Sequence, residues 1–206
     1  MYEDSQYIEK VCKKVRMAGL IYSLISGAIA IALTVFGVIM LRTDPESAGY
    51  ILVLALIAYV VLGVVGLFRV FAPLKFIGKA KNANVHKYAP SMDRKIIYQD
   101  KHMVVSEQAI ANAKKPEEIV GREDVLAAWV YTQSYNFIPT SKTLNLYTPE
   151  NVIVRFNVYG MRKEKINELF KTIATYCPNC RFGYSPDNYK FVAFSQKQYR
   201  EANKKS

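Results

Sequence analysis

The most chemically suggestive motif in this sequence is Cys177-x-x-Cys180. Two cysteines at this spacing bind zinc when a second ligand pair completes the coordination, and in other settings they form a redox couple. The chain's other cysteine and its histidines, Cys12, His86 and His102, form no second ligand pair. Cys177 also falls at the C-terminal end of an expected helix, where the helix dipole disfavours a thiolate. We therefore favour core packing for Cys177, with a metal site at Cys177 and Cys180 and a redox role as the alternatives.

The sequence offers no motif for a catalytic nucleophile or for a phosphate-binding loop. It contains no G-x-S-x-G elbow and no P-loop. Glu123 and Asp124 have no evident acid or base partner in the sequence. We therefore expect no catalytic residue, no bound metal and no cofactor, and hence a non-enzymatic protein. A membrane-anchored enzyme is retained as the less favoured alternative.

The apolar residues are concentrated in the first third of the chain. The protein has 206 residues, a net charge of +11 and 51% hydrophobic residues. Two runs, 17–41 and 47–68, contain 25 and 22 residues without a charged side chain. A bilayer core about 30 Å thick requires roughly 20 apolar helical residues. The sequence therefore predicts transmembrane helices at 17–41 and 49–70 within a hairpin over 17–72, which excludes a simple soluble globule.

The basic residues that flank the two runs predict the orientation of this hairpin. Four lie in residues 1–16, which are predicted to form a cytosolic N-terminal segment, one (Arg42) lies between the runs, and five lie in residues 69–87. The positive-inside rule then places both termini in the cytoplasm, in a multi-pass protein of the inner or plasma membrane. Neither run contains an ionisable Asp, Glu, Lys, Arg or His residue, which argues against a pump or a pore.

Small residues recur on one face of the first predicted helix. Gly19, Ser23 and Gly27 are spaced four residues apart, so that helical backbones could approach closely there. Packing within the hairpin is the favoured interpretation. A homo-oligomer formed through the same face is the alternative.

The segment after the hairpin, 73–94, is predicted to be a basic juxtamembrane linker. Arg69, Lys75, Lys79 and Lys81 could contact anionic headgroups, each contributing about 1 kcal/mol. A solvated basic helix face explains the same pattern equally well. Because the positive charge is concentrated beside the predicted bilayer, the lipid bilayer is the expected partner and nucleic acid is not.

From about residue 95 the pattern changes to short alternating segments, which are typical of strands. Expected strands are 103–105, 109–111, 124–132, 142–148 and 152–159, the last two joined at Pro149. The spacing then predicts an amphipathic helix over 162–176, with Ile166, Leu169, Ile173 and Cys177 on one face. The expected fold class is α+β, with a domain over 95–184 and a C-terminal tail over 185–206.

The order of these elements resembles a known family. The Glu123-Asp-Val125 segment, the hairpin at Pro149-Glu-Asn151 and the helix that ends in Cys177-Pro-Asn-Cys180 are similar to bacterial pleckstrin-homology-like domains of membrane proteins of unknown function. The resemblance implies an antiparallel β-barrel capped by the C-terminal helix, and scaffolding or sensing at the inner face of the membrane. The loop Ser106-Glu-Gln108 is acidic rather than basic, so a phosphoinositide site does not carry over.

Two non-enzymatic functions remain. The first is a membrane protein that presents an interaction or scaffold domain to an unknown protein partner, with Tyr135 and Phe137 in an expected loop as contacts, because aromatic residues are enriched at binding hot spots. The second is a module that senses anionic lipid at the membrane surface.

Overall fold

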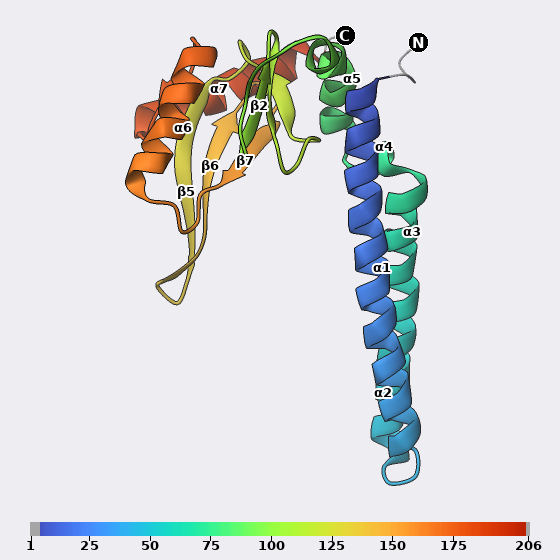
Figure 1. The fold of residues 1–206 in the computed structure, drawn as a ribbon. Helices are drawn as coiled ribbons and strands as arrows, with labels where there is room; N and C mark the ends of the chain where they lie inside the picture. The colour runs from blue at the N-terminus through green and yellow to red at the C-terminus, as the bar shows by residue number, and fades with distance from the viewer. Residues whose placement is uncertain (1–4, 205–206) are drawn as a thin grey trace. The chain divides into compact units, whose positions relative to one another are not determined.

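The computed structural model describes residues 5–204, apart from the side chains of residues 61–63. This part of the chain forms two compact units (Figure 1). One is helical and covers residues 10–78. The other combines residues 5–9 with residues 79–204 and contains all the strands. Each is described by itself.

The helical unit contains two long helical runs joined by a short turn. They are α1 (Gln6–Met40) and a second run made of α2 (Pro45–Ile57), the π-helical turn η1 (Ala58–Leu62) and α3 (Gly63–Phe71). Both runs are long and apolar enough to cross a membrane. The prediction of two apolar helices is confirmed at this level. A short helix, α4 (Pro73–Phe76), follows.

The turn between the two runs is shorter than the sequence predicted. The second run begins at Pro45 rather than at residue 49 because Asp44 caps it, accepting a hydrogen bond from the Ser47 backbone N–H at 3.2 Å. Proline fits the first helical position, where its missing N–H would have no partner in any case. The first run likewise begins at Gln6, well before residue 17.

The predicted stripe of small residues is partly used inside the helical unit. A Cβ added to Gly19 would lie 2.6 Å from Arg69 Cβ and 3.1 Å from the Gly66 carbonyl oxygen, and one added to Gly66 would meet the Ser23 hydroxyl. One added to Gly27 would meet nothing within 4 Å. Gly19 and Ser23 therefore serve packing between the two runs, and the homo-oligomer through this face stays a prediction.

Two glycine-to-alanine variants test this packing, one at a close contact and one at an open position. Gly19→Ala should lower the free energy of unfolding by about 1–3 kcal/mol, because the added methyl group overpacks the contact with Arg69 and Gly66. Gly27→Ala should cause no such loss. Thermal unfolding of the full chain in detergent, followed by far-ultraviolet circular dichroism, checks both. Equal stabilities of the two variants would contradict the packing.

The second unit contains two four-stranded sheets. The first has the order β1-β2-β3-β4 and is antiparallel throughout; the second has the order β7-β6-β5-β8, in which only β5 and β8 are parallel. The strands are β1 (Ile96–Gln99), β2 (Met103–Ser106), β3 (Ala109–Asn112), β4 (Ile119–Gly121), β5 (Ala127–Tyr135), β6 (Ile138–Tyr147), β7 (Ile153–Asn157) and β8 (Arg181–Phe182).

The expected strands and their hairpins are found close to the predicted positions. β6 and β7 pair across the turn at Pro149, with Leu144 opposite Phe156, and both side chains are buried. The alternation is visible in β7, where Val154 and Phe156 are buried and Arg155 is exposed. β1, β4 and β8 were not predicted.

Helix α6 (Lys163–Tyr176) confirms the amphipathic helix expected at 162–176. Its apolar face, with Ile166, Leu169 and Ile173, joins one core cluster with side chains from both sheets, including Ile110 of β3 and Phe156 of β7. The chain is therefore α+β, with two apolar N-terminal helices, a sheet region and a helix after the strands.

The segment 73–94 is not only a linker, because most of it forms α5 (Lys79–Arg94) of the sheet unit. Tyr88 donates from its hydroxyl to Asp124 Oδ2 at 2.6 Å, and Asn84 Nδ2 donates to the Ile119 carbonyl at 3.3 Å. From the N-terminal residues, Tyr7 donates from its hydroxyl to the Pro116 carbonyl at 2.7 Å. Val85, Ala89 and Met92 of α5 are also buried, so apolar packing and these bonds together explain why a segment of low overall hydrophobicity is ordered.

The segment 185–206 was expected to be a tail, but it contains helix α7 (Pro186–Ala202). Ser185 caps this helix by accepting from the Asn188 N–H at 3.1 Å, and Pro186 occupies the first turn. Val192 is buried against Ala127 and Trp129 of β5. Residues 1–4 of the predicted N-terminal segment and residues 205–206 of the predicted tail lie outside the described residues.

Candidate functional site

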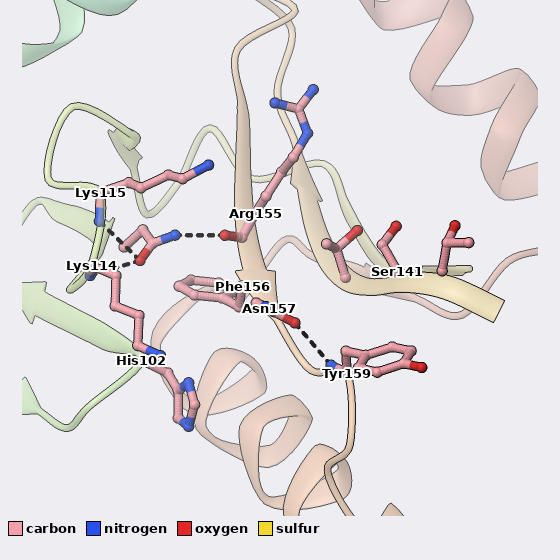
Figure 2. Close-up of a pocket in the computed structure, with 11 residues that line it drawn as sticks. His102, Lys114, Lys115, Ser141, Arg155, Phe156, Asn157 and Tyr159 are labelled. Carbon is pink, nitrogen blue, oxygen red and sulfur yellow. Dashed lines mark hydrogen bonds between the residues drawn. The ribbon is translucent and has the colours of Figure 1, made fainter. Parts of the chain in front are cut away.

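A hollow of about 370 Å³ lies within the sheet unit and carries a concentration of basic side chains; we call it the basic pocket. It is bordered by the connection before β2, the β3–β4 connection, and strands β6 and β7 (Figure 2). Its lining residues are His102, Asn112, Lys114, Lys115, Thr140, Ser141, Thr143, Arg155, Phe156, Asn157 and Tyr159. Three of these are Lys or Arg, one is His, and none of the eleven is acidic.

The basic side chains are arranged at two places around the pocket. Figure 2 shows Lys114 extending towards His102, and Lys115 extending towards Arg155. Lys115 Nζ lies 3.9 Å from Glu118 Oε1. In the described part of the chain, no acidic side chain lies within ion-pair distance of the Arg155 guanidinium. The pocket therefore presents positive charge that the protein only partly compensates.

A buried carboxylate beneath the pocket holds its two sides together. Glu118 is only 2% exposed, and its Oε2 accepts a hydrogen bond from the Arg155 backbone N–H at 2.8 Å and another from Asn112 Nδ2 at 3.4 Å. Its Oε1 lies 3.7 Å from Lys81 Nζ. Asn112 Nδ2 also donates to the Arg155 carbonyl. Side chains thus join the end of β3 to β7, strands that belong to different sheets.

The same asparagine shapes the loop that carries the lysines. Asn112 Oδ1 accepts from the backbone N–H groups of Lys114 at 2.8 Å and Lys115 at 3.2 Å (Figure 2). Such local bonds are typical of asparagine at the start of a turn. The loop backbone is therefore fixed independently of any ligand, which favours binding by a preformed site.

Hydroxyl groups complete the lining on the side of β6. Thr140, Ser141 and Thr143 come from this strand. A second hollow of about 310 Å³ shares Ser141, Thr143 and Arg155 with the basic pocket. Ammonium, guanidinium and hydroxyl donors around a cavity are the groups that bind phosphate or sulfate oxyanions. The arrangement suits oxyanion binding, and it pairs no nucleophile with a base.

His102 gives the pocket a dependence on pH. Burial lowers the pKa of His102, the neighbouring charges of Lys101 and Lys114 lower it further, and Asp100 opposes the shift. The imidazole is therefore neutral at pH 7 and gains its proton only on acidification. A bound anion would favour the protonated form.

We expect the affinity for sulfate, whose charge is constant over this range, to rise as the pH falls from 7.5 to 5.5. Protonation of His102 adds a positive charge at the pocket. His102→Gln should remove most of this pH dependence while leaving the binding at pH 7.5 nearly unchanged. Calorimetric titrations at constant ionic strength check this, and an identical pH profile in the variant would contradict the assignment.

The structure buries both cysteines of the Cys-x-x-Cys motif. Cys177 follows α6, packs in the core, and donates from its backbone N–H to the Ile173 carbonyl at 2.7 Å. Burial raises the pKa of both Cys177 and Cys180 to about 12. Over residues 5–204, no three His, Cys, Asp or Glu residues are grouped as a metal site would require.

The four predicted headgroup contacts have different surroundings. Lys75 and Lys79 are exposed. The Arg69 guanidinium lies over the rings of Tyr22 and Phe76, at 5.0 and 4.2 Å from their centroids. Lys81 pairs with Glu118. Protein groups therefore contact two of the four cations, so lipid contact by those two would compete with these interactions.

The two predicted partner contacts are exposed, but they do not lie in an irregular loop. Tyr135 ends β5 and pairs with Ile138 of β6, so that only Asn136 and Phe137 form the turn. Both have positive φ, 47° and 65°, as a two-residue hairpin requires. The segment 135–139 is thus the tip of a tight β-hairpin.

The basic pocket itself was not foreseen from the sequence. In the sequence, His102 belongs to no ligand pair, and Lys114 and Lys115 belong to no recognised binding motif. The available signals were this lysine pair directly after a strand and the exposed Arg155 in an alternating strand. Comparison with family models, curated proteins and solved structures found no match to the chain.

Proposed function

We propose that this protein is a non-enzymatic membrane protein in which a two-helix hairpin anchors a pleckstrin-homology-like domain, and that the domain binds phosphate-type oxyanions in the basic pocket. The observation that carries this proposal is the lining of the pocket. Four basic side chains and several hydroxyl groups surround a cavity without a lining carboxylate. Of the two functions expected from the sequence, this favours the sensing of anionic lipid.

The membrane anchoring is supported by the two long apolar helices and the charges around them. Four basic residues precede the first apolar run and five follow the second, against one between them. We place the protein in the inner or plasma membrane. Under the positive-inside rule, both termini and the sheet domain then face the cytoplasm.

The pleckstrin-homology-like assignment is supported by the order of elements. A meander of four strands is followed by a meander of three and then by α6, which contributes to the core between them. The side-chain bonds of Asn112 at the end of β3, and of Glu118 directly before β4, link the first sheet to the Arg155 backbone in β7 of the second. We propose that these contacts help to close the sheets into the partly open barrel that the resemblance implies.

Calorimetric titration of the full chain with glycerol 3-phosphate, a soluble phosphomonoester, tests the proposal. The chain is embedded in phosphatidylcholine nanodiscs, so that no anionic lipid competes. We expect saturable binding at one site. Absence of binding in these discs would refute the phosphate site.

The same titration in nanodiscs that contain phosphatidylglycerol identifies the natural source of the oxyanion. A lower apparent affinity there would show that lipid headgroups occupy the pocket. An unchanged affinity would assign the pocket to soluble phosphates. The scaffold hypothesis concerns Tyr135 and Phe137, which do not line the pocket, and it is tested separately below.

A further inference from the structure

The hairpin of β5 and β6 extends beyond the rest of its sheet. β7 pairs with β6 only as far as Thr143, opposite Asn157. Beyond that point β5 and β6 pair only with each other, from Thr132 opposite Lys142 to Tyr135 opposite Ile138. We call residues 132–142 the β5–β6 arm. Residues 132–140 are all exposed, so the arm is a two-stranded ribbon with neither face covered, an arrangement of marginal stability in water.

The residue at the tip of the arm does not suit the turn. Phe137 has φ 65°, and its side chain is fully exposed, at 101%. Glycine is preferred at this position of a two-residue hairpin, and a bulky residue there is strained. Neither turn geometry nor packing accounts for a phenylalanine here. Its presence is better explained by something that the tip contacts.

The composition of the arm indicates which surface it contacts. Tyr135 and Ile138 flank the tip and are 72% and 68% exposed. From residue 125 to residue 149 the chain contains no acidic residue and one charge, Lys142 at the base of the arm. Aromatic and aliphatic residues at a tip, with a cation behind them, match the interface of a bilayer, whose headgroups are anionic or zwitterionic and whose interior is apolar.

The position of the basic pocket is consistent with contact between the tip of the arm and a bilayer. Thr140 and Ser141 belong to the arm and also line the pocket. Strands rise about 3.3 Å per residue, so Phe137 lies roughly 10 Å beyond Thr140. Headgroups occupy only several ångströms on each side of a bilayer. A tip just below the headgroups would therefore leave the pocket close to their level.

We propose that the β5–β6 arm inserts its tip, Phe137 with Tyr135 and Ile138, into the acyl boundary of the membrane in which the hairpin is anchored. The proposal rests on the proposed function, because the covalent anchor keeps the arm at high effective concentration near the bilayer. Insertion needs no ligand in the pocket, so the two can be tested apart.

The test places a fluorescent label on the arm without removing Phe137. Exposed Ser134 is replaced by cysteine and labelled with an environment-sensitive dye, in the Cys12→Ser background. Cys177 and Cys180 are buried and stay unlabelled. The full chain is placed in phosphatidylcholine nanodiscs with or without bromine on the acyl chains. Exposed Tyr189 of α7, replaced by labelled cysteine, serves as the control.

We expect brominated lipid to reduce the fluorescence at position 134 at least twofold and to leave position 189 unaffected. Phe137→Gly should abolish this quenching while leaving the Trp129 fluorescence unchanged and the turn at least as stable, because glycine suits the φ of 65°. Equal quenching at positions 134 and 189, or quenching that persists in folded Phe137→Gly, would overturn the proposal.

Three further outcomes are distinguished by adding aqueous iodide as a second quencher and Arg155→Glu as a second variant. If the arm label is shielded from aqueous iodide but not quenched by brominated lipid, a protein partner or a second copy covers the tip, and the membrane proposal is wrong. Arg155→Glu should leave the quenching intact, so a failure of phosphate binding alone would not affect it. If the chain does not embed in the nanodiscs, the proposed membrane anchoring is wrong, and the proposed insertion of the arm is wrong with it.

Discussion

The Glu118→Ala variant is expected to unfold with a free energy about 3–5 kcal/mol lower than that of the unmodified chain. The carboxylate is almost fully buried and is the shared partner of the Arg155 N–H, Asn112 Nδ2 and Lys81. Its removal would leave a backbone N–H and an amide donor without this acceptor, and would leave the half-buried Lys81 ammonium without its counter-charge. Because these groups belong to α5, β3 and β7, their loss would loosen three elements at once.

Denaturant titration of the full chain in detergent, followed by fluorescence, measures this loss. Trp129 is the single tryptophan, is buried in β5, and is stacked on Tyr147 with the ring centroids 4.0 Å apart, so it reports on the sheet unit. Glu107→Ala is the control. Its carboxylate pairs with Lys95 at 3.3 Å in an exposed position, and such pairs contribute about 0–1 kcal/mol. Similar losses for the two variants would contradict the role assigned to Glu118.

Glu118→Gln separates hydrogen bonding from charge. The glutamine oxygen can still accept from the Arg155 N–H, so this variant should retain part of the lost stability. The negative charge that faces Lys81 and Lys115 is absent. An intermediate free energy of unfolding is expected, and a loss as large as that in Glu118→Ala would assign the whole effect to the charge.

The second large effect is expected on ligand binding. Arg155→Glu and Lys115→Glu should each weaken the binding of glycerol 3-phosphate by about tenfold or more, since a hydrogen bond to a charged group contributes about 1.5–3 kcal/mol and each variant also adds repulsion. The fold should tolerate the change at Arg155, because Glu118 and Asn112 bond to its backbone rather than to its guanidinium.

Lys171→Glu controls for the change in net charge. Lys171 is exposed on α6 and does not line the basic pocket. Calorimetry in phosphatidylcholine nanodiscs should give this variant the affinity of the unmodified chain. If all three variants weakened binding equally, the effect would reflect the overall charge of the protein and the pocket would lose its role.

The sequence predicted those parts of the fold whose signals are local. The apolar stripe of Ile166, Leu169 and Ile173 predicted α6, and Pro149 between two alternating segments predicted the β6–β7 hairpin. The two apolar runs predicted the helices of the first unit. In each case the periodicity or composition of a single segment was sufficient.

The missed elements depend on contacts between distant segments. α5 is held by hydrogen bonds from Asn84 and Tyr88 to partners 35 and 36 residues away, so its own polar composition resembled a linker. β8 is two residues long and exists through its pairing with β5. α7 did carry a local start signal, Ser185 followed by Pro186. The basic residues Arg200, Lys204 and Lys205 near its end favour a solvated tail instead.

The basic pocket could not be predicted from the sequence for the same reason, because it depends on contacts between distant segments. Arg155 lies more than 40 positions after His102 and Lys114 in the sequence, and it lines the same pocket because the end of β3 is bonded to β7. Nothing in the sequence near Asn112 indicates that its amide contacts β7. The tip residues Tyr135 and Phe137 were recognised by their type, but their strand pairing requires the register of β5 and β6.

The binding of phosphate in the basic pocket is tested most directly by the two histidines of the chain. His102 lines the pocket, whereas His86 lies in α5 and does not. The full chain, with isotope-labelled histidine and in phosphatidylcholine nanodiscs, is titrated with glycerol 3-phosphate while the imidazole resonances are recorded by nuclear magnetic resonance. We predict a saturable shift of the His102 resonances and none of His86. Resonances that both stay in place, or that move together, would contradict a phosphate site at this pocket.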